Sequence, residues 1–186
     1  REITGKAGHI SYMLQKDLLM PYRTVLDNIA LPLIIKGAPK KEARRKALEH
    51  FAEFGLSGTE KQYPAQLSGG MRQRAAFART LLTGSELLLL DEPFSALDFL
   101  TRITMQEWLL GQWENDHKTV LFITHDVEEA IFLSGRVLVV EETPICRLAS
   151  FEVPAPYPRT RACLTEPRML ALRERLIGML RREVAV

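Results

Sequence analysis

The sequence has few cysteines and no long apolar run. Its two cysteines, Cys146 and Cys163, have the spacing of neither a disulfide framework nor a metal site. We therefore expect two free thiols in a reducing, cytoplasmic compartment. No apolar stretch is long enough to span a bilayer, and no signal-peptide pattern is present. Any association with a membrane is then expected to depend on a partner.

The sequence also lacks an excess of charge of one sign. It has 25 Lys and Arg against 23 Asp and Glu, a net charge of +2, which does not favour nucleic acid as a partner. Of its 186 residues, 46% are hydrophobic, enough for a globular domain with one core.

A short glycine-containing segment, Leu67 to Arg74, is the most informative part of the chain. We expect it to be a loop that turns into a helix, with Ser68 as the N-cap. Gly69 and Gly70 leave backbone N–H groups open to a ligand, and a helix N-terminus favours an anion such as phosphate. The alternative for this segment alone is an ordinary Ser-capped surface helix.

An apolar run that ends in two acids follows at 86–93. Such a run predicts a strand buried on both faces, as in a parallel sheet. The carboxyl ends of such strands are where open α/β sheets bind ligands. Asp91 is then a candidate to hold Mg²⁺, directly or through water, and Glu92 a candidate to polarise a water molecule. The alternative is that the two acids only mark the exit of the strand into solvent.

A second buried strand is predicted by the β-branched and aromatic run at 119–124. His125 stands at its carboxyl end, just before a predicted helix that starts near Val127. An imidazole at this position could contact a terminal phosphate and orient water. A lone histidine is more often a structural hydrogen-bonding residue.

Taken together, these segments resemble the ATP-binding cassette (ABC) ATPases. Residues 67–71 are similar to the signature motif and 87–92 to the Walker B strand with its catalytic glutamate. Three further segments resemble the Q-loop at 12–17, which contains Gln15, the D-loop at 95–98 and the switch histidine, His125. The motifs occur in the order found in the family, and such an ordered set is far more specific than any single motif.

The resemblance implies ATP and Mg²⁺ as ligands and a head-to-tail dimer of ATPase subunits. Gln15 and Asp91 would organise Mg²⁺ and water, Glu92 would be the general base, and His125 would hold the γ-phosphate. The signature residues would contact ATP bound to the opposite subunit; they are Ser68, Gly69 and Gly70. Ser95 and Asp98 of the D-loop would communicate across the interface.

The G-x-x-x-x-G-K-[ST] pattern is absent from the sequence. This P-loop supplies the phosphate cradle, a lysine and a Mg²⁺-binding hydroxyl, and the family places it before the Q-loop. Only fourteen residues precede Gln15, and Gly5-Lys6 is followed by Ala7. We therefore expect the C-terminal part of a longer protein, inactive by itself. The alternative is a natural degenerate subunit that does not hydrolyse ATP and acts only as an interaction module.

The resemblance implies an α/β fold: a partial P-loop NTPase (RecA-like) core with a parallel sheet and the ABC helical subdomain, lacking the N-terminal strands. Strands at 87–91, 119–124 and 136–141 alternate with helices near 96–114 and 127–134, which predicts a parallel sheet. Two late strands are expected at 137–140 and 145–153. Within one domain, 1–15 would be a strand and the Q-loop, 16–83 the helical subdomain and signature helix, 84–153 the α/β core, and 154–186 the tail helix.

Two helices outside the motifs have clear patterns. Pro39 and Gly55 would bound the first, with Ala43, Ala47, Leu48, Phe51 and Phe54 on one face and Glu42 paired with Lys46. Its basic residues at 40–46 are expected to form a solvated face. Pro167 would start an amphipathic tail helix with Met169, Leu172, Leu176 and Leu180 on one stripe. Seven arginines lie between Arg159 and Arg182.

The segments at 21–29 and 124–130 are similar to those of importer ATPases. The segments at 96–102 and 158–161 are most similar to the nitrate/sulfonate/taurine group, which includes relatives assigned to thiamine precursors. The expected partners are a second ATPase subunit, transmembrane permease subunits that contact the helical subdomain, and indirectly a substrate-binding protein. The protein would then be peripheral on the inner face of the cell membrane. A repair or translation factor of the ABC superfamily is the remaining alternative.

Overall fold

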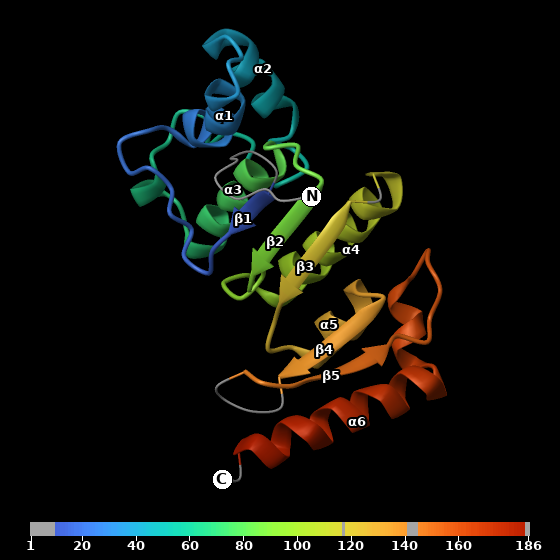
Figure 1. Cartoon of the computed structure of the whole chain (residues 1–186). Coiled ribbons are helices and arrows are strands. Elements are labelled where there is room, and N and C mark those ends of the chain that lie inside the picture. The colour runs from blue at the N-terminus through green and yellow to red at the C-terminus, as the bar shows by residue number, and fades with distance from the viewer. Residues whose placement is uncertain (1–9, 117, 141–144, 185–186) are drawn as a thin grey trace. The chain divides into compact units, whose positions relative to one another are not determined.

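A computed structural model of the chain describes residues 10–116, 118–140 and 145–184 (Figure 1). The chain divides into two compact units. The first contains residues 1–105 and 117–123, and the second contains residues 106–116 and 124–186.

The first unit contains a parallel sheet with the order β1-β2-β3. These strands are β1 (Ile10–Met13), β2 (Leu87–Asp91) and β3 (Thr119–Ile123). In the central strand, Leu88 and Leu90 lie on one face and are buried, whereas Leu87 and Leu89 on the other face are only half-buried. The predicted burial of this strand on both faces is therefore wrong. Met13 is in register with Leu90, and Asp91 with Ile123, so the three carboxyl ends lie at one edge. The strands predicted at 87–91 and 119–124 are confirmed in position. The expected burial of the second is wrong, since Leu121 and Ile123 of β3 are 52% and 51% exposed. The strand expected within residues 1–15 is observed as β1, and residues 1–9 lie outside the described residues.

Three α-helices and a short 3₁₀ turn lie within residues 16–83, where mainly helical structure was expected. They are α1 (Val25–Ile35), α2 (Lys40–Glu49), η1 (Pro64–Gln66) and α3 (Gly69–Leu81). Thr24 caps α1 by accepting a hydrogen bond from the N–H of Asp27 at 3.2 Å. Asn28, which is fully buried, binds the backbone of the preceding loop: it accepts from Met20 N at 2.7 Å and donates to the carbonyl of Arg23 at 3.1 Å. These contacts hold the loop that enters α1.

The helix predicted between Pro39 and Gly55 is shorter than expected. It begins after Pro39 but ends at Glu49, and Gly55 lies in a following turn with φ +59°. Phe51 and Phe54 are buried as predicted, although they project from this turn region rather than from the helix. Leu48 was placed on the buried face, and this was wrong, because it is 47% exposed.

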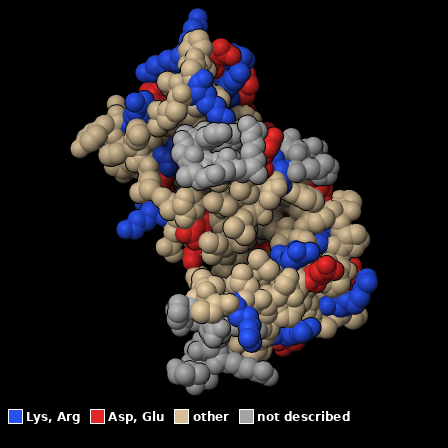
Figure 2. Space-filling view, viewed as in Figure 1, with Lys and Arg blue, Asp and Glu red and all other residues tan. Residues whose placement is uncertain are grey.

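The basic face of α2 is a solvated surface of ion pairs, as expected. Glu42 and Lys46 form the predicted i,i+4 pair at 3.2 Å. Arg45 pairs with Glu49 at 2.6 Å, and Arg44 lies 3.5 Å from Asp27. Figure 2 shows the resulting mixture of positive and negative side chains where Figure 1 places α2. Exposed pairs of this kind contribute little to stability.

A line of four aromatic rings forms the centre of the first unit. Phe77 of α3 packs edge to face against Phe54 at 6.0 Å and against Phe94 at 5.7 Å. Phe94 in turn lies 5.9 Å from Phe122 of β3. Such aromatic pairs add stability beyond the area they bury. They fix α3 and the loop after β2 relative to the sheet.

The second unit is built around an antiparallel pair of strands, β4 (Arg136–Val140) and β5 (Leu148–Glu152). We predicted that 136–141 would continue the parallel alternation, and this was wrong. Among the residues that the structure describes, β4 pairs only with β5. The connection between them is short, and a parallel pair would need a crossover of about a dozen residues or more. The two late strands expected at 137–140 and 145–153 correspond to β4 and β5, and residues 141–144 between them lie outside the described residues.

The remaining helices are α4 (Phe99–Asp116), which begins in the first unit and ends in the second, and α5 (Val127–Leu133) and α6 (Pro167–Val184) in the second unit. A 3₁₀ turn, η2 (Arg161–Thr165), precedes α6. The helix predicted near 96–114 begins only at Phe99, because residues 95–97 form a turn.

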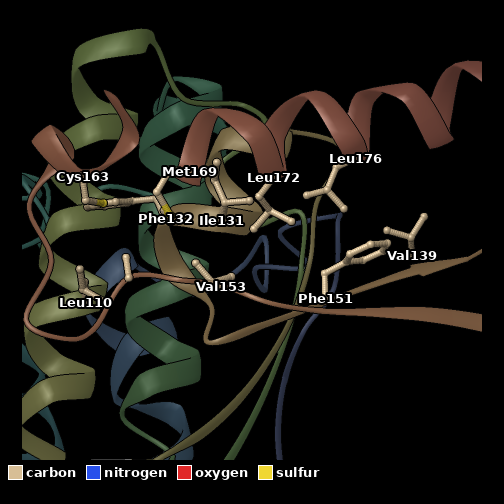
Figure 3. Close-up of a cluster of buried hydrophobic side chains, with 11 residues drawn as sticks. Leu110, Ile131, Phe132, Val139, Phe151, Val153, Cys163, Met169, Leu172 and Leu176 are labelled. Atoms are coloured by element: carbon tan, nitrogen blue, oxygen red, sulfur yellow. The ribbon is translucent and has the colours of Figure 1, made fainter. Parts of the chain in front are cut away.

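The tail helix α6 starts at Pro167 as predicted and covers the hydrophobic core of the second unit (Figure 3). Met169, Leu172 and Leu176 of α6 are buried in this core. The other buried members of the cluster come from α4, α5, the two strands and the segments that follow them: Leu110, Ile131, Phe132, Val139, Phe151, Val153, Ala155 and Cys163. Leu180 was expected on the same stripe but is 37% exposed.

One tail arginine, Arg159, is inside this unit rather than on its surface. It is 8% exposed and donates hydrogen bonds to the carbonyls of Ile131, Phe132 and Ser134 at 3.2, 3.2 and 2.7 Å. These carbonyls belong to the C-terminal end of α5, where a cation is favourable. Arg159 therefore caps α5 from the tail.

Candidate functional site

The carboxyl edge of the parallel sheet brings together two of the predicted site residues. Gln15 follows β1 and Glu92 follows β2, 77 positions later. Gln15 Nε2 donates a hydrogen bond to Glu92 Oε2 at 3.2 Å. Asp91, the last residue of β2, is half-buried at the same edge. The amide and the two carboxylates thus converge as the parallel register requires.

Glu92 has an unusual backbone conformation, with φ +46°. A non-glycine residue in this left-handed region carries a conformational cost that the surrounding structure must offset. Part of that offset is a hydrogen bond from Glu92 N to the carbonyl of Ile123, the last residue of β3, at 2.9 Å. The direction of the Glu92 side chain is therefore set by the sheet itself.

The buried amide of Gln73 supports the same loop from the other side. Gln73 lies on α3, is 4% exposed, and donates to the carbonyl of Glu92 at 3.0 Å and to Ser95 Oγ at 3.3 Å. Its own oxygen accepts from Ala96 N at 2.8 Å. One side chain of α3 thus connects the candidate base with the start of the D-loop.

The first turn of α3 is open to solvent, as a surface that contacts a second molecule must be. Ser68 caps the helix by accepting from Met71 N at 3.2 Å, which confirms the predicted N-cap. Ser68 and Gly69 are exposed. A Cβ on Gly70 would lie 3.4 Å from the carbonyl oxygen of Ala96, so this turn packs against the D-loop.

Two arginines of α3 hold the segment that follows Gln15. Arg72 Nε lies 3.1 Å from Asp17 Oδ2. Arg79 donates to the carbonyls of Asp17 and Leu18 at 2.7 and 2.8 Å. Burial lowers the pKa of the Arg79 guanidinium from its ordinary value, and the nearby charge of Asp17 partly opposes that shift. The Q-loop is thereby anchored to the signature helix.

Asp98 of the D-loop has a local structural role. Its Oδ1 accepts a hydrogen bond from Thr101 N at 3.1 Å, in the first turn of α4. Hydrogen bonds from Thr101 lower the pKa of this exposed carboxyl below its ordinary value. The bond from the Thr101 side chain has the larger effect, and the bond from its backbone N–H comes next. Ser95 donates to the carbonyl of Glu92 at 3.0 Å. The D-loop is thus a compact turn between the candidate base and α4.

His125 belongs to the second unit and is exposed, directly before the N-cap of α5. Asp126 is that cap, accepting from Glu128 N at 2.8 Å and from Glu129 N at 3.2 Å. Because Asp91 and Glu92 lie in the first unit, the expected meeting of His125 with these acids stays a prediction.

Several supporting residues escaped the sequence analysis. Gln73 lies within the segment that we singled out, and its signal was a polar side chain on the helical face shared with Phe77 and Thr80, both of which are buried. Glu129 and Gln106 are also buried polar residues on helices. The hydrogen bond between them joins residues 23 positions apart, and no local pattern indicates it.

The donor set at the sheet edge suits a Mg²⁺ ion that a nucleotide helps to bind. Among the residues that the structure describes, no three His, Cys, Asp or Glu side chains form a metal site by themselves. Mg²⁺ is commonly held by one or two carboxylates together with phosphate oxygens and water. Asp91, with the amide oxygen of Gln15, fits such a partial site. In the described part of the chain, no helix combines the length and apolarity needed to cross a bilayer.

The chain belongs to the ABC transporter family. The family model for ABC transporters matches residues 1–95. The chain is 41% identical over 186 residues to an uncharacterized ABC transporter ATP-binding protein, MJ0412, of Methanocaldococcus jannaschii, with 99% of this chain and 68% of that protein covered.

Import ATP-binding proteins are among its relatives. Formylaminopyrimidine import ATP-binding protein ThiZ of Halalkalibacterium halodurans is 52% identical over 147 residues, which cover 79% of this chain and 59% of ThiZ. Taurine import ATP-binding protein TauB of Rhizobium johnstonii is 42% identical over 173 residues, covering 90% of this chain and 66% of TauB. These matches bear out the predicted resemblance to the nitrate/sulfonate/taurine group. The chain spans about three fifths to two thirds of the length of these relatives.

A solved structure of the ATP-binding cassette MJ0796, a dimer in a post-hydrolysis state bound to ADP and Pi, is also similar. Its TM-score is 0.65 at 36% identity, with 69% of this chain and 57% of that chain covered. The predicted fold class, a partial P-loop NTPase core, is confirmed.

Proposed function

We propose that this chain is part of the ATP-binding and ATP-hydrolysing subunit of an ABC importer that energises uptake of a small solute through a membrane permease. The observation that carries the proposal is the hydrogen bond between Gln15 and Glu92 at the carboxyl edge of the sheet. It joins the candidate water-orienting amide and the candidate base, which come from two strands far apart in sequence.

In the proposed mechanism, Glu92 accepts a proton from the water that attacks the γ-phosphate of ATP, and Gln15 orients that water. His125 donates a hydrogen bond to the γ-phosphate. Asp91 and Gln15 would hold Mg²⁺, which would neutralise charge on the phosphates. Most of the rate enhancement then comes from positioning and charge stabilisation, as is usual for phosphoryl transfer.

The signature segment acts on the nucleotide of a second subunit. Ser68, Gly69 and Gly70 would contact the γ-phosphate of ATP bound there, because their turn is exposed and its helix N-terminus suits an anion. Ser95 and Asp98 would communicate across the same interface. ATP would bind the closed dimer better than the open one, and so shift the equilibrium that drives transport.

Exposed apolar residues near the Q-loop support the permease as a partner. Leu18, Met20 and Tyr22 follow Gln15 and are 56%, 43% and 93% exposed, and Ile35 at the end of α1 is 75% exposed. Large apolar side chains exposed together in one unit are typical of an interaction surface. We propose that they receive a helix of the permease at the cytoplasmic face of the membrane.

The relatives named for formylaminopyrimidine and taurine favour a small organic solute. We propose that the permease and a substrate-binding protein, rather than the ATPase subunit, contact the solute and select its chemical class. For the 186-residue chain alone we propose no hydrolysis, because its sequence has no G-x-x-x-x-G-K-[ST] loop to bind the phosphates.

The test is ATP hydrolysis by the full-length protein reconstituted with its permease in liposomes. We expect phosphate release that Glu92→Gln abolishes while binding of a fluorescent ATP analogue remains. Glu174→Gln, the same change at an exposed glutamate of α6, is the control and should hydrolyse ATP normally. Binding without hydrolysis in the unsubstituted complex would favour the degenerate interaction subunit instead. Normal turnover by Glu92→Gln would remove Glu92 from the role of base.

A further inference from the structure

The loop that carries His125 is connected to the C-terminal segment by buried polar side chains of the second unit. The central one is Glu129 on α5, which is 7% exposed. A buried carboxylate is costly unless hydrogen-bond donors compensate it. The identity and position of those donors therefore matter.

Both oxygens of Glu129 accept hydrogen bonds from residues outside α5. Thr124, which directly precedes His125, donates from Oγ1 to Glu129 Oε2 at 2.5 Å. Thr124 Oγ1 also accepts from Asp126 N, which directly follows His125, at 3.0 Å. The hydroxyl of Thr124, on one side of His125, thus binds the backbone N–H of Asp126 on the other side. The same hydroxyl binds the buried carboxylate of Glu129.

The other oxygen of Glu129 leads to the tail. Gln106 of α4 is 3% exposed and donates from Nε2 to Glu129 Oε1 at 2.7 Å. The opposite end of this amide, Gln106 Oε1, accepts from the guanidinium of Arg161. Arg161 is the first residue of η2, and its Nε lies 3.5 Å from Glu107 Oε1. Its guanidinium carbon stacks over the ring of Phe132, 5.0 Å from the ring centroid. These contacts hold its guanidinium in one place.

We propose that Arg161 positions His125 through this series of hydrogen bonds, and that the C-terminal segment is thereby a part of the catalytic machinery. The role given to His125 rests on the proposed function, whereas the link itself does not. Arg161 orients the Gln106 amide, since its guanidinium can only donate and so requires the amide oxygen. That leaves the amide NH₂ to bind Glu129, and the second carboxylate oxygen to fix the Thr124 hydroxyl. In the catalytic reaction only His125 contacts ATP, while the other members are positioning residues.

A second arginine of the tail provides a matched control. Arg173 of α6 also reaches α5, where its Nε lies 3.2 Å from Glu128 Oε1. The two side chains of this pair are 37% and 49% exposed, so the pair lies at the surface of the unit. Arg161→Gln and Arg173→Gln remove the same charge from the same segment, but only the first interrupts the series.

The first experiment measures amide hydrogen exchange at Asp126 by NMR in the full-length protein, without nucleotide. We expect Arg161→Gln and Thr124→Val to speed this exchange about tenfold, since a hydrogen bond that holds the amide is weakened or lost. Thr124→Ser, which keeps the hydroxyl, and Arg173→Gln should leave the exchange within about twofold of the unsubstituted protein. Equal exchange in Arg161→Gln and Arg173→Gln, with unchanged melting temperatures, would overturn the link.

The second experiment measures ATP hydrolysis by the same variants in the reconstituted complex. We expect Arg161→Gln to lower kcat about tenfold with little change in KM, and Thr124→Ser to restore the activity lost in Thr124→Val. A variant that melted early but kept its kcat would instead show a structural role only. Should the unsubstituted complex fail to hydrolyse ATP, the proposed function would fall, while the exchange measurement would still decide whether Arg161 orders the His125 loop.

Discussion

Gln73 donates a hydrogen bond from its buried side-chain amide to the backbone carbonyl of Glu92 at 3.0 Å, and accepts one from Ala96 N at 2.8 Å. The helix that begins with the signature segment is therefore attached to the loop that contains the candidate base. Within one subunit, a movement of α3 would be transmitted to Glu92 through this amide.

Substitution of Gln73 by leucine, which has nearly the same size, should test this attachment. The change leaves the Ala96 N–H and the Glu92 carbonyl without this partner, so we expect the free energy of unfolding to fall by about 1–3 kcal/mol. Urea denaturation of the full-length protein measures it. Gln66 provides the control, since its Oε1 accepts from Tyr63 N at 2.8 Å but it is exposed. Equal losses in Gln73→Leu and Gln66→Leu would contradict the prediction.

The positive φ of Glu92 predicts a difference between glycine and alanine at this position. Glycine adopts φ +46° without the cost that a Cβ brings, and neither substitution keeps the carboxylate. We expect Glu92→Gly to be more stable than Glu92→Ala by about 1 kcal/mol, measured by urea denaturation. At Asp91, where the backbone is that of a strand, the same pair of substitutions should show the opposite order. Greater stability of Glu92→Ala would mean that the loop relaxes once the side chain is removed.

Arg159 should contribute more to stability than any exposed arginine of the tail. It binds three carbonyls at the end of α5 and, at 2.5 Å, the carbonyl of Ala155. A lysine would keep the charge but could not reach these acceptors together, so we expect Arg159→Lys to destabilise the protein by about 2–3 kcal/mol. Arg175 is the control: it is exposed and stacks over the ring of Phe151 at 4.7 Å, and Arg175→Lys should cost well under about 1 kcal/mol. Thermal unfolding compares the two, and a loss at Arg159 no larger than that at Arg175 would count against the capping role.

The lowered pKa of Asp98 predicts a pH dependence with a defined sign. Hydrogen bonds from Thr101 favour the ionised carboxyl in the folded state, so the folded pKa lies below the ordinary value of 3.8. The stabilisation is therefore present above pH 3.8 and is lost as the pH falls below this value through the folded pKa. An NMR titration of the Asp98 carboxyl carbon should show a midpoint below 3.8 in the unsubstituted protein. In Thr101→Ala the midpoint should move up toward 3.8, because the first of these hydrogen bonds, from the Thr101 side chain, is removed. A midpoint that stayed in place would assign the shift to the backbone N–H groups alone.

The predictions from sequence succeeded where a local pattern was sufficient. The strand that ends at Asp91, the capping of α3 by Ser68 and the start of α6 at Pro167 are confirmed. The failures have a common cause. Leu48 fits the apolar period of α2 but is 47% exposed. The strand at 136–140 fits an alternating α/β pattern but pairs antiparallel with the strand that follows it. Periodicity gives the face of an element and leaves its neighbour undefined.

The sequence by itself determined the family and the order of its motifs, since each motif is a short run of residues. Only the tertiary structure placed Gln15 against Glu92, buried Gln73 beneath that loop, and connected Arg161 with Thr124 through Gln106 and Glu129. A hydrogen bond depends on distance and direction between two groups, and for residues tens of positions apart these are set by how the elements pack.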